Sequence, residues 1–302
     1  MEWDRVRHSL LEVIHMKIGF IGAGKVGFSL GKYLSLYGIP VAGYYSRNYE
    51  SAKSAAAFTH SSAFSDLKAL LNVSDTLFLT VPDGEIESLW DDIKELPINN
   101  KKICHCSGCL SSSVFHGIEA LGAFGYSVHP LYAISSQTES YKELQRAIFT
   151  LEGSFFYLSE MKTMFESTGS SVQIISGEKK ALYHAAAVCA SNQMLALAKV
   201  SQNLLLRCGF SDDLAQQALR PLMLGNMEKL CTTSLEDALT GPIERGDIQT
   251  VLHHLDFLEE EETMLYLILS KQLLKIARKK NPNRSYKKIE LLLLEEMKGR
   301  AQ

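Results

Sequence analysis

A glycine-rich turn between a strand and a helix is the feature that most constrains how this chain folds. The apolar stretch 17–21 has the composition of a buried strand and runs into Gly22-Ala23-Gly24-Lys25-Val26-Gly27, a GxGxxG pattern followed by an amphipathic helix. Gly22 permits the tight turn, Gly24 lets the backbone approach a pyrophosphate, and Gly27 lets helix and strand pack closely. A purely structural turn is the alternative, but strand, turn and helix coincide here. We therefore predict a dinucleotide site formed by these six residues.

The end of the next strand predicts which dinucleotide binds. Residues 39–45 form this strand, and Ser46, Arg47 and Asn48 follow it. Enzymes that use NAD carry an acidic residue here, about 20 residues after the first glycines, to bind the ribose 2′-hydroxyl. A guanidinium flanked by neutral donors suits the 2′-phosphate of NADP instead. We expect NADP(H) as the cofactor; the alternative is that Arg47 is a solvated loop residue.

Length and composition favour a two-domain enzyme. The chain has 302 residues, 46% of them apolar, and a net charge of −3, which gives no reason to expect a nucleic-acid partner. No apolar run reaches the ~18 residues that a membrane span needs. The segment 10–14 is short and contains Glu12, unlike a signal peptide, so we expect a cytoplasmic protein. Met16 directly precedes the first strand, and we interpret residues 1–15 as an extension.

A cysteine cluster invites a metal-binding hypothesis. Residues 104–109 read Cys-His-Cys-Ser-Gly-Cys and contain a CxxC spacing. A zinc site needs four well-directed ligands, and the sequence has no second CxxC or HxxxH motif to complete them. We expect no metal, and we interpret the thiols as free cysteines of a reducing compartment.

Alternation of short apolar runs with helical segments predicts the fold class. Up to residue 176 the pattern is typical of a doubly wound parallel sheet, that is, an α/β Rossmann domain. From residue 177 onward, long helical segments follow one another with few strand formers. The predicted organisation is an extension (1–15), an NADP-binding Rossmann domain (16–176) and an all-helical domain for substrate binding and dimerisation (177–302).

Residues at the predicted strand ends are candidate site residues, because ligands of such sheets bind at the carboxyl ends of the strands. For the cofactor these candidates are Val81, Pro82, Asp83, Ser107 and Gly108; for the substrate they are His105, Ser107 and His129. Two structural alternatives stay open. Asp83 is equally suited to cap the helix that follows it, and His129 could be a structural histidine beside Pro130.

The first long helix of the second domain carries a second group of candidates. Lys180, His184 and Ser191 share one helical face, and Asn192 adjoins Ser191. Small alanines surround them, so a ligand can approach closely. Lysine, histidine and asparagine supply a cation, a proton donor and an orienting amide. We take Lys180, His184 and Asn192 as catalytic candidates and Ser191 as a substrate ligand. The alternative, if each residue is considered alone, is that Lys180 is an ordinary surface lysine and His184 an ordinary core histidine.

A punctuated loop before a later helix suggests where a carboxylate binds. Gly241-Pro242 and Arg245-Gly246 mark turns, and Asp247 suits the first position of the helix. We expect Arg245 and the helix start at Asp247 to hold a substrate carboxylate. The alternative is a helix entry without a ligand.

Several separated motifs resemble one family. They are the GxGxxG turn, His105-Cys106-Ser107-Gly108, His129-Pro130, Tyr183-His184-Ala185-Ala186-Ala187 with Ser191-Asn192, and Thr240-Gly241-Pro242 with Arg245-Gly246-Asp247. From about residue 16 to 269 the chain resembles a Rossmann-like family that has a C-terminal domain of unknown function. That family is similar to the 6-phosphogluconate dehydrogenase superfamily, which includes ketopantoate reductase and pyrroline-5-carboxylate reductase.

The resemblance implies roles for single residues. In the superfamily, a lysine near the start of the second domain exchanges a proton with the substrate oxygen, and an asparagine follows four residues later. Lys180 matches the lysine, but His184 stands where the asparagine would be, and either could be the acid. Ketopantoate reductases also carry an Arg-Gly-x-x-Thr-Glu stretch. Residues 245–250 match only its first two positions, with Gln249 and Thr250 in place of the threonine and glutamate.

The resemblance and the motifs together suggest an NADPH-dependent oxidoreductase acting on a CH–OH group. We expect it to reduce a small 2-oxo acid, with ketopantoate, an intermediate of pantothenate and coenzyme A synthesis, as the leading substrate. Alternatives are an imine reductase of the pyrroline-5-carboxylate type and a non-catalytic NADPH-binding sensor. Apolar helix faces in the second domain, such as the one containing Val251 and Leu255, favour a homodimer.

Overall fold

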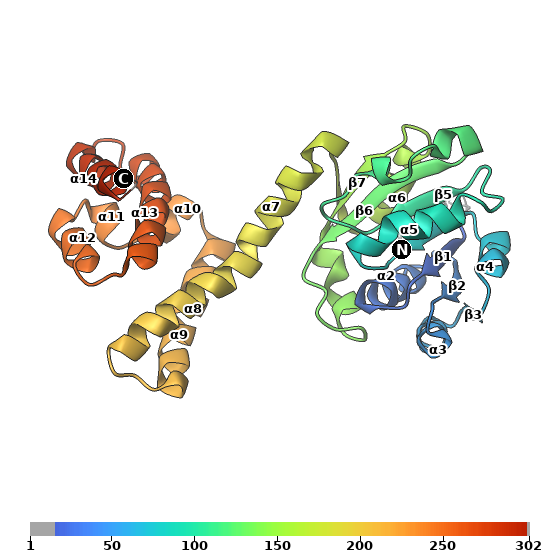
Figure 1. The fold of residues 1–302 in the computed structure, drawn as a ribbon, viewed down its shortest axis with the longest axis horizontal. Coiled ribbons are helices and arrows are strands. Elements are labelled where there is room, and N and C mark those ends of the chain that lie inside the picture. Colours follow the sequence, from blue (N-terminus) through green and yellow to red (C-terminus); the bar gives the residue numbers. More distant parts are fainter. Residues whose placement is uncertain (1–15, 301–302) are drawn as a thin grey trace, which may run out of the picture. The chain divides into compact units, whose positions relative to one another are not determined.

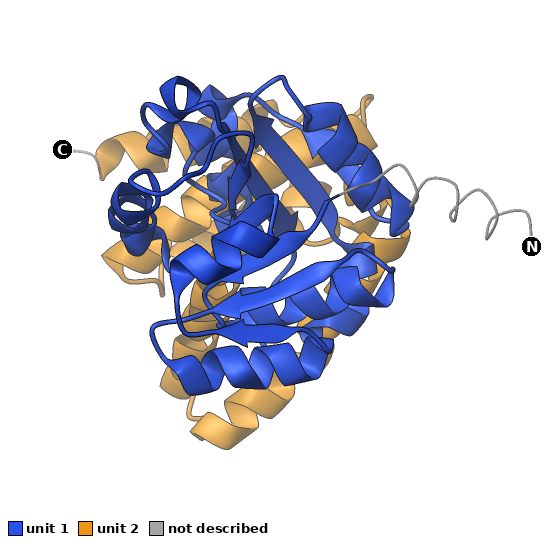
Figure 2. Ribbon diagram, turned by 90° about the vertical axis from the view of Figure 1, so that its right-hand side faces the viewer, with its two compact units in different colours: residues 1–191 blue, residues 192–302 orange. Residues whose placement is uncertain are grey.

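The computed structural model describes residues 16–300 (Figure 1), so the predicted extension 1–15 lies outside the described residues. The chain divides into two units between Ser191 and Asn192 (Figure 2). The domain boundary expected from the sequence, after residue 176, lies 15 residues before this division. Helix α7 (Lys180–Ala190) groups with the sheet because its side chains contact His129 and the Ser107 carbonyl, which lie in the sixth strand and after the fifth strand along the chain.

The first unit contains one eight-stranded sheet. The strand order is β3-β2-β1-β4-β5-β6-β7-β8, and the first six strands in this order are parallel. The strands are β1 (Ile18–Ile21), β2 (Val41–Tyr45), β3 (Ser62–Phe64), β4 (Thr76–Leu79), β5 (Lys102–His105), β6 (Phe124–Leu131), β7 (Ile148–Gly153) and β8 (Ser171–Ile174). This order and direction are those of a Rossmann sheet, which confirms the predicted fold class.

The last two strands depart from the all-parallel expectation. β7 runs antiparallel to β6, and β8 runs parallel to β7. The connection from Leu131 to Ile148 contains only the 3₁₀ helix η3 (Ser140–Arg146), and the two residues at its ends pair with each other. Because the chain does not cross back to the opposite edge of the sheet, β7 starts where β6 ends and must run the other way.

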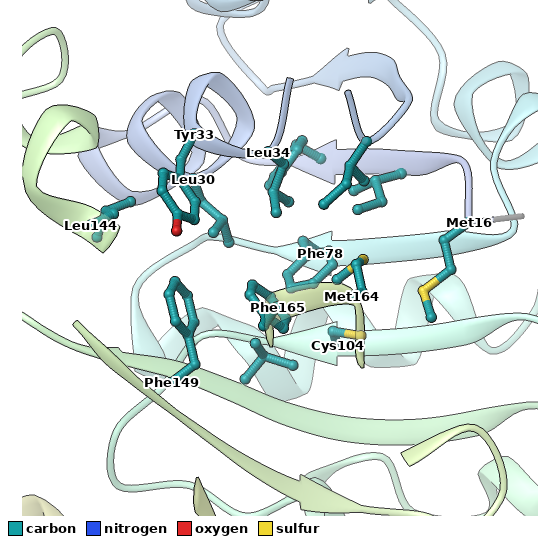
Figure 3. Close-up of a cluster of buried hydrophobic side chains, with 14 of the residues drawn as sticks. Met16, Leu30, Tyr33, Leu34, Phe78, Cys104, Leu144, Phe149, Met164 and Phe165 are labelled. Atoms are coloured by element: carbon teal, nitrogen blue, oxygen red, sulfur yellow. The ribbon is translucent and has the colours of Figure 1, made fainter. Parts of the chain in front are cut away.

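Helices cover both faces of the sheet, as the continuous apolar strands require. The first-unit helices are α2 (Lys25–Leu36), α3 (Tyr49–Thr59), α4 (Leu67–Val73), α5 (Asp83–Ile93), α6 (Leu158–Ser167) and α7, with 3₁₀ turns η1 (Ser112–Val114), η2 (Ile118–Leu121), η3 and η4 (Gly177–Lys179). On one face α2, α3 and α6 pack on Phe78 and Phe149 (Figure 3). On the other, α4 and α5 pack on Leu77 and Ile103. Burial of each large side chain stabilises the fold by about 2 kcal/mol.

The second unit is all helical, as predicted. It consists of α8 (Asn192–Arg207), α9 (Asp212–Thr232), α10 (Leu235–Ala238), α11 (Pro242–Arg245), α12 (Ile248–Leu255), α13 (Glu260–Lys280) and α14 (Lys287–Gly299). Its core lies among α11 to α14 and includes Val251, Leu267 and Leu274. By contrast, α8 has no buried residue and α9 buries only Ala215.

The long helical segment that begins near residue 178 is interrupted. Ser191, with φ −124° and ψ −76°, ends α7, and α8 begins at the next residue. No helix within residues 16–300 is long and apolar enough to cross a membrane. The same residues contain no group of three or more His, Cys, Asp or Glu side chains arranged to hold a metal ion.

Candidate active site

The GxGxxG turn links β1 to α2, and each glycine has its own steric environment. Gly22 has φ +104°, and a Cβ atom there would lie 2.8 Å from the Thr80 carbonyl oxygen. A Cβ atom on Gly27 would lie 2.6 Å from both the Gly22 carbonyl and Thr80 Oγ1. At Gly24, the N-cap of α2, an added Cβ atom would meet nothing within 4 Å. Packing therefore explains two of the glycines, and at Gly24 the helix start is left open for a ligand.

A cavity of about 400 Å³ adjoins this turn. Seven of the predicted cofactor residues line it: Gly22, Ala23, Gly24, Ser46, Arg47, Val81 and Pro82. Asn48 instead caps α3, where its Oδ1 accepts a hydrogen bond from the Glu50 N–H at 3.1 Å. The cavity joins the helix start to the end of β2, which are the places where a dinucleotide's pyrophosphate and ribose bind in this fold.

Arg47 makes an ion pair at the wall of this cavity that the sequence did not suggest. Its Nη2 lies 2.9 Å from Glu85 Oε1 and 2.6 Å from Oε2. Glu85 stands in the first turn of α5, where an acidic side chain also suits the helix dipole, so its presence there did not single it out. The guanidinium that we expect to bind a phosphate thus contacts a carboxylate.

Ser107 organises the loop that follows β5. Its Oγ donates to Asp83 Oδ2 at 2.6 Å and accepts hydrogen bonds from the backbone N–H groups of Cys109 (3.1 Å) and Leu110 (2.9 Å). Asp83 is the first residue of α5, and Pro82 is its N-cap. Hydrogen bonds of Ser107 therefore connect the loop after β5 to the start of α5.

His105 is fully buried and has a partner on each ring nitrogen. Nδ1 accepts the Ser107 N–H at 3.2 Å, and Nε2 lies 3.2 Å from the Ser111 carbonyl oxygen. These partners place the proton on Nε2. Burial lowers the pKa of His105 to about 4, so the ring is neutral near pH 7. In this arrangement the two ring nitrogens of His105 hold the loop after β5 in position.

Lys180 lies at the start of α7 and is 1% exposed. Its Nζ donates to the Ser107 carbonyl oxygen at 2.9 Å. Burial lowers the pKa of Lys180, and the negative charge of Glu152 opposes that shift most strongly. The lysine is thus anchored to the same loop that Asp83 and His105 hold.

Two histidines pack against Gly108. A Cβ atom there would lie 2.5 Å from His184 Nδ1 and 3.0 Å from His129 Nε2, so only glycine fits. The rings lie 6.4 Å apart and perpendicular, and His129 Nδ1 lies 2.7 Å from Tyr183 Oη. Burial lowers the pKa of His129 to about 4. Among residues 16–300, His184 Nδ1 is the one buried side-chain nitrogen or oxygen without a hydrogen-bond partner. Such an atom is costly unless a ligand satisfies it.

Two further side chains near this site were missed by sequence reasoning. Tyr183 follows Lys180 by three residues, a spacing that places both on one helix face. Glu152 is an acidic residue within the apolar strand β7, and it is 8% exposed. Its carboxylate accepts hydrogen bonds from the N–H (2.7 Å) and Oγ (2.8 Å) of Ser112. Helical periodicity could have found the tyrosine, and the break in apolar pattern the glutamate.

The remaining candidates lie at the end of α7 and in the second unit. Ser191 Oγ donates to the Ala187 carbonyl at 2.7 Å, and Asn192 begins α8. Asp247 caps α12 by accepting from the Thr250 N–H at 3.1 Å and Oγ1 at 2.7 Å. Its carboxylate, 3.9 Å from Arg245, therefore occupies the helix start that we expected to bind a substrate carboxylate. The guanidinium of Arg245 is 58% exposed.

Two family models match the chain in consecutive segments. Residues 17–103 match the family described as NADP oxidoreductase, coenzyme F420-dependent. Residues 147–273 match a domain of unknown function, DUF2520. These two segments are thus similar to an NADP oxidoreductase domain and to a DUF2520 region, which confirms the expected NADP(H) cofactor. A search of curated proteins finds no match.

Solved structures show the same fold over nearly their whole length. Protein TM1727 from Thermotoga maritima is 26% identical, with a TM-score of 0.71 over 87% of this chain and 99% of that chain. A candidate NADP oxidoreductase from Bacteroides fragilis is 22% identical, with a TM-score of 0.63 over 86% and 98%. Pyrroline carboxylate reductase from Plasmodium falciparum, solved with NADP bound, is 17% identical, with a TM-score of 0.56 over 88% and 97%.

Proposed function

We propose that this chain is an NADPH-dependent reductase of a small 2-oxo acid, with ketopantoate as the first substrate to test. The observation that carries the proposal is the position of the polar cluster. Asp83, Ser107 and His129 lie at the carboxyl ends of parallel strands, or directly after them, beside a GxGxxG turn with an open helix start. Ligands of doubly wound sheets bind at this edge.

The residues present fit the cofactor. The turn from Gly22 to Gly27 would hold the pyrophosphate, and Ser46 and Arg47 would hold the 2′-phosphate. Val81 and Pro82 complete the same cavity, and Ser107 and Gly108 lie on the loop next to it. When bound, NADPH supplies the hydride, and the chain's own groups bind, orient and protonate the substrate.

The two candidate acids have different hydrogen-bond partners. Lys180 donates to the Ser107 carbonyl, which is consistent with holding the loop, although its lowered pKa also makes proton release easier. His184 presents an unsatisfied Nδ1 toward Gly108, where a substrate or cofactor oxygen would provide the missing hydrogen bond. We assign proton delivery to His184 or Lys180 acting at this point. Asn192 stays a predicted catalytic residue, and Ser191 and Arg245 stay predicted substrate ligands.

Reduction of a C=N bond is the second candidate, and two observations favour it. The fold extends over nearly the whole pyrroline carboxylate reductase chain, whose name identifies an imine-type substrate class. The carboxylates of Asp83 and Glu152 near Lys180 would also tolerate a cationic substrate. A non-catalytic NADPH sensor is the competing class.

Absorbance-monitored oxidation of NADPH tests the proposal directly. The purified protein is given ketopantoate, other 2-oxo acids and cyclic imines, with NADH in parallel. Saturable turnover of a 2-oxo acid with NADPH preferred supports the proposal, and turnover of imines alone supports the second candidate. NADPH binding without any turnover indicates a sensor.

A double variant, Lys180→Ala with His184→Ala, separates catalysis from binding. We expect kcat/KM to fall by about 100-fold or more, the usual size of a general-acid contribution, with NADPH affinity changed only a few-fold. Lys179→Ala is the matched control, because that lysine adjoins Lys180 but is exposed. Full activity in the double variant would remove both residues from the mechanism.

A further inference from the structure

The cavity that we assign to NADPH has an ion pair at its wall. Arg47 follows β2, and Glu85 belongs to the first turn of α5. Both residues line the cavity of about 400 Å³ that includes the GxGxxG turn. The Arg47 Nη2 atom contacts both carboxylate oxygens of Glu85, at 2.9 and 2.6 Å, while the arginine side chain is 80% exposed.

The chemistry of Arg47 explains why this contact matters for a phosphate. A guanidinium recognises carboxylate and phosphate through the same donor geometry. The Glu85 carboxylate therefore occupies a place on Arg47 that a ribose 2′-phosphate would take. Two anions that compete for one guanidinium also repel each other in a partly enclosed site.

We propose that Glu85 is an intramolecular competitor of the 2′-phosphate and a determinant of cofactor selectivity. On binding, the phosphate takes over Arg47 and Glu85 is released. Selectivity for NADPH over NADH is then smaller than Arg47 alone would confer, because only NADPH has to displace the carboxylate. This inference rests on the proposed function insofar as it takes NADPH as the cofactor.

The expected size of the effect follows from the exposure of the pair. Glu85 is 39% exposed and Arg47 80%, so the ion pair is screened by solvent and yields readily. Removing the carboxylate should tighten NADPH binding by about twofold to tenfold, since it abolishes both the competing contact and the repulsion. NADH lacks the phosphate, so its affinity should change less than about twofold.

Dissociation constants for NADPH and NADH, measured by calorimetry on the whole protein, test the proposal. The variants are Glu85→Gln, Arg47→Gln and the combination of both. Glu87→Gln is the matched control, because it removes the same charge from an exposed position of the same helix. Glu85→Gln should tighten NADPH selectively, Glu87→Gln should not, and Glu85→Gln should lose its effect when Arg47 is already replaced.

Three results would overturn the inference. Equal effects of Glu85→Gln and Glu87→Gln on NADPH affinity would mean that Glu85 acts only through the net charge of the protein. Weaker binding of both cofactors by Glu85→Gln would mean that Glu85 binds a group common to both, such as a ribose hydroxyl. A wild-type protein that binds neither cofactor would overturn the proposed function as well, whereas in the first two cases the proposed function stands.

Discussion

Two buried titratable side chains near the candidate site, His105 and Lys180, have lowered pKa values. His105 is enclosed with both nitrogens bonded, and Lys180 is anchored to the Ser107 carbonyl. Each lies where water cannot stabilise its charged form, so burial lowers both pKa values. For His105 the shift has a direct consequence for stability as a function of pH.

We predict that His105 makes the protein less stable as the pH falls through the mildly acidic range. Its pKa is about 4 in the folded chain and 6.5 in the unfolded chain. Between these values the unfolded chain binds a proton that the folded chain does not, so the free energy of unfolding decreases as pH falls. The loss should reach about 3 kcal/mol by pH ~4. Urea unfolding at several pH values measures it.

Two variants isolate this contribution from the carboxylates that titrate in the same range. His105→Asn should show a smaller loss of stability on acidification than the wild type. His60→Asn should match the wild type, because His60 is exposed and its left-handed backbone (φ 56°) suits asparagine. Identical pH dependence in wild type and His105→Asn would contradict the prediction.

At the scale of elements, glycines on helix α2 serve two different purposes. A Cβ atom on Gly31 would lie 1.7 Å from Tyr44 Oη, so this glycine allows α2 to pack against β2. A Cβ atom on Gly24 would touch no protein atom, although Gly24 belongs to the same helix start. Packing therefore requires glycine at position 31, and it does not require glycine at position 24.

We predict opposite outcomes for alanine at these two positions. Gly31→Ala should destabilise the protein by about 1–3 kcal/mol, the usual cost of overpacking a core. Gly24→Ala should change stability by less than ~1 kcal/mol, yet weaken NADPH binding by about tenfold or more, because the methyl group takes the space of the pyrophosphate. Thermal unfolding and calorimetry measure the two effects. Unchanged NADPH affinity in Gly24→Ala would argue against a phosphate at this helix start.

At the scale of the whole molecule, two of the longest helices of the second unit, α8 and α9, bury almost none of their residues. Helix α8 buries no residue, and α9 exposes Leu222 (63%) and Leu224 (61%). Apolar surfaces of this kind in a folded chain usually mark an interface. A second copy of the same chain is the occupant we expect, because closed dimers are the commonest assemblies of soluble proteins.

We predict a homodimer in solution, and light scattering after size-exclusion chromatography measures it. Replacing Leu222 and Leu224 together by lysine should shift the protein to a monomer, because buried charges without partners oppose association. Gln216→Lys adds charge at an exposed polar position of the same helix and should leave the dimer intact. A wild-type protein that is monomeric at all concentrations would contradict the prediction.

Local patterns predicted the elements well and their directions less well. Apolar runs predicted the first two strands at 17–21 and 39–45, where β1 and β2 lie, and the glycine spacing predicted the turn between β1 and α2. The predicted parallel direction of β7 was wrong, since β7 runs antiparallel to β6. Strand direction depends on how the connection crosses the sheet, which residue periodicity does not encode. The interruption at Ser191 was missed because its flanking residues are all compatible with a helix.

By itself, the sequence determined the Rossmann fold, the helical second unit, the glycine-rich turn and NADP(H) as the cofactor, since each prediction depends on residues that are neighbours in the chain. Only the tertiary structure decided which side chains meet. Arg47 and Glu85 are 38 positions apart, and Lys180 and Ser107 are 73 apart. Packing of strands and helices around the sheet brings such pairs together, and it leaves His184 Nδ1 buried without a partner at Gly108. Contacts of this kind depend on backbone positions in space, and a linear pattern carries no information about them until the fold is complete.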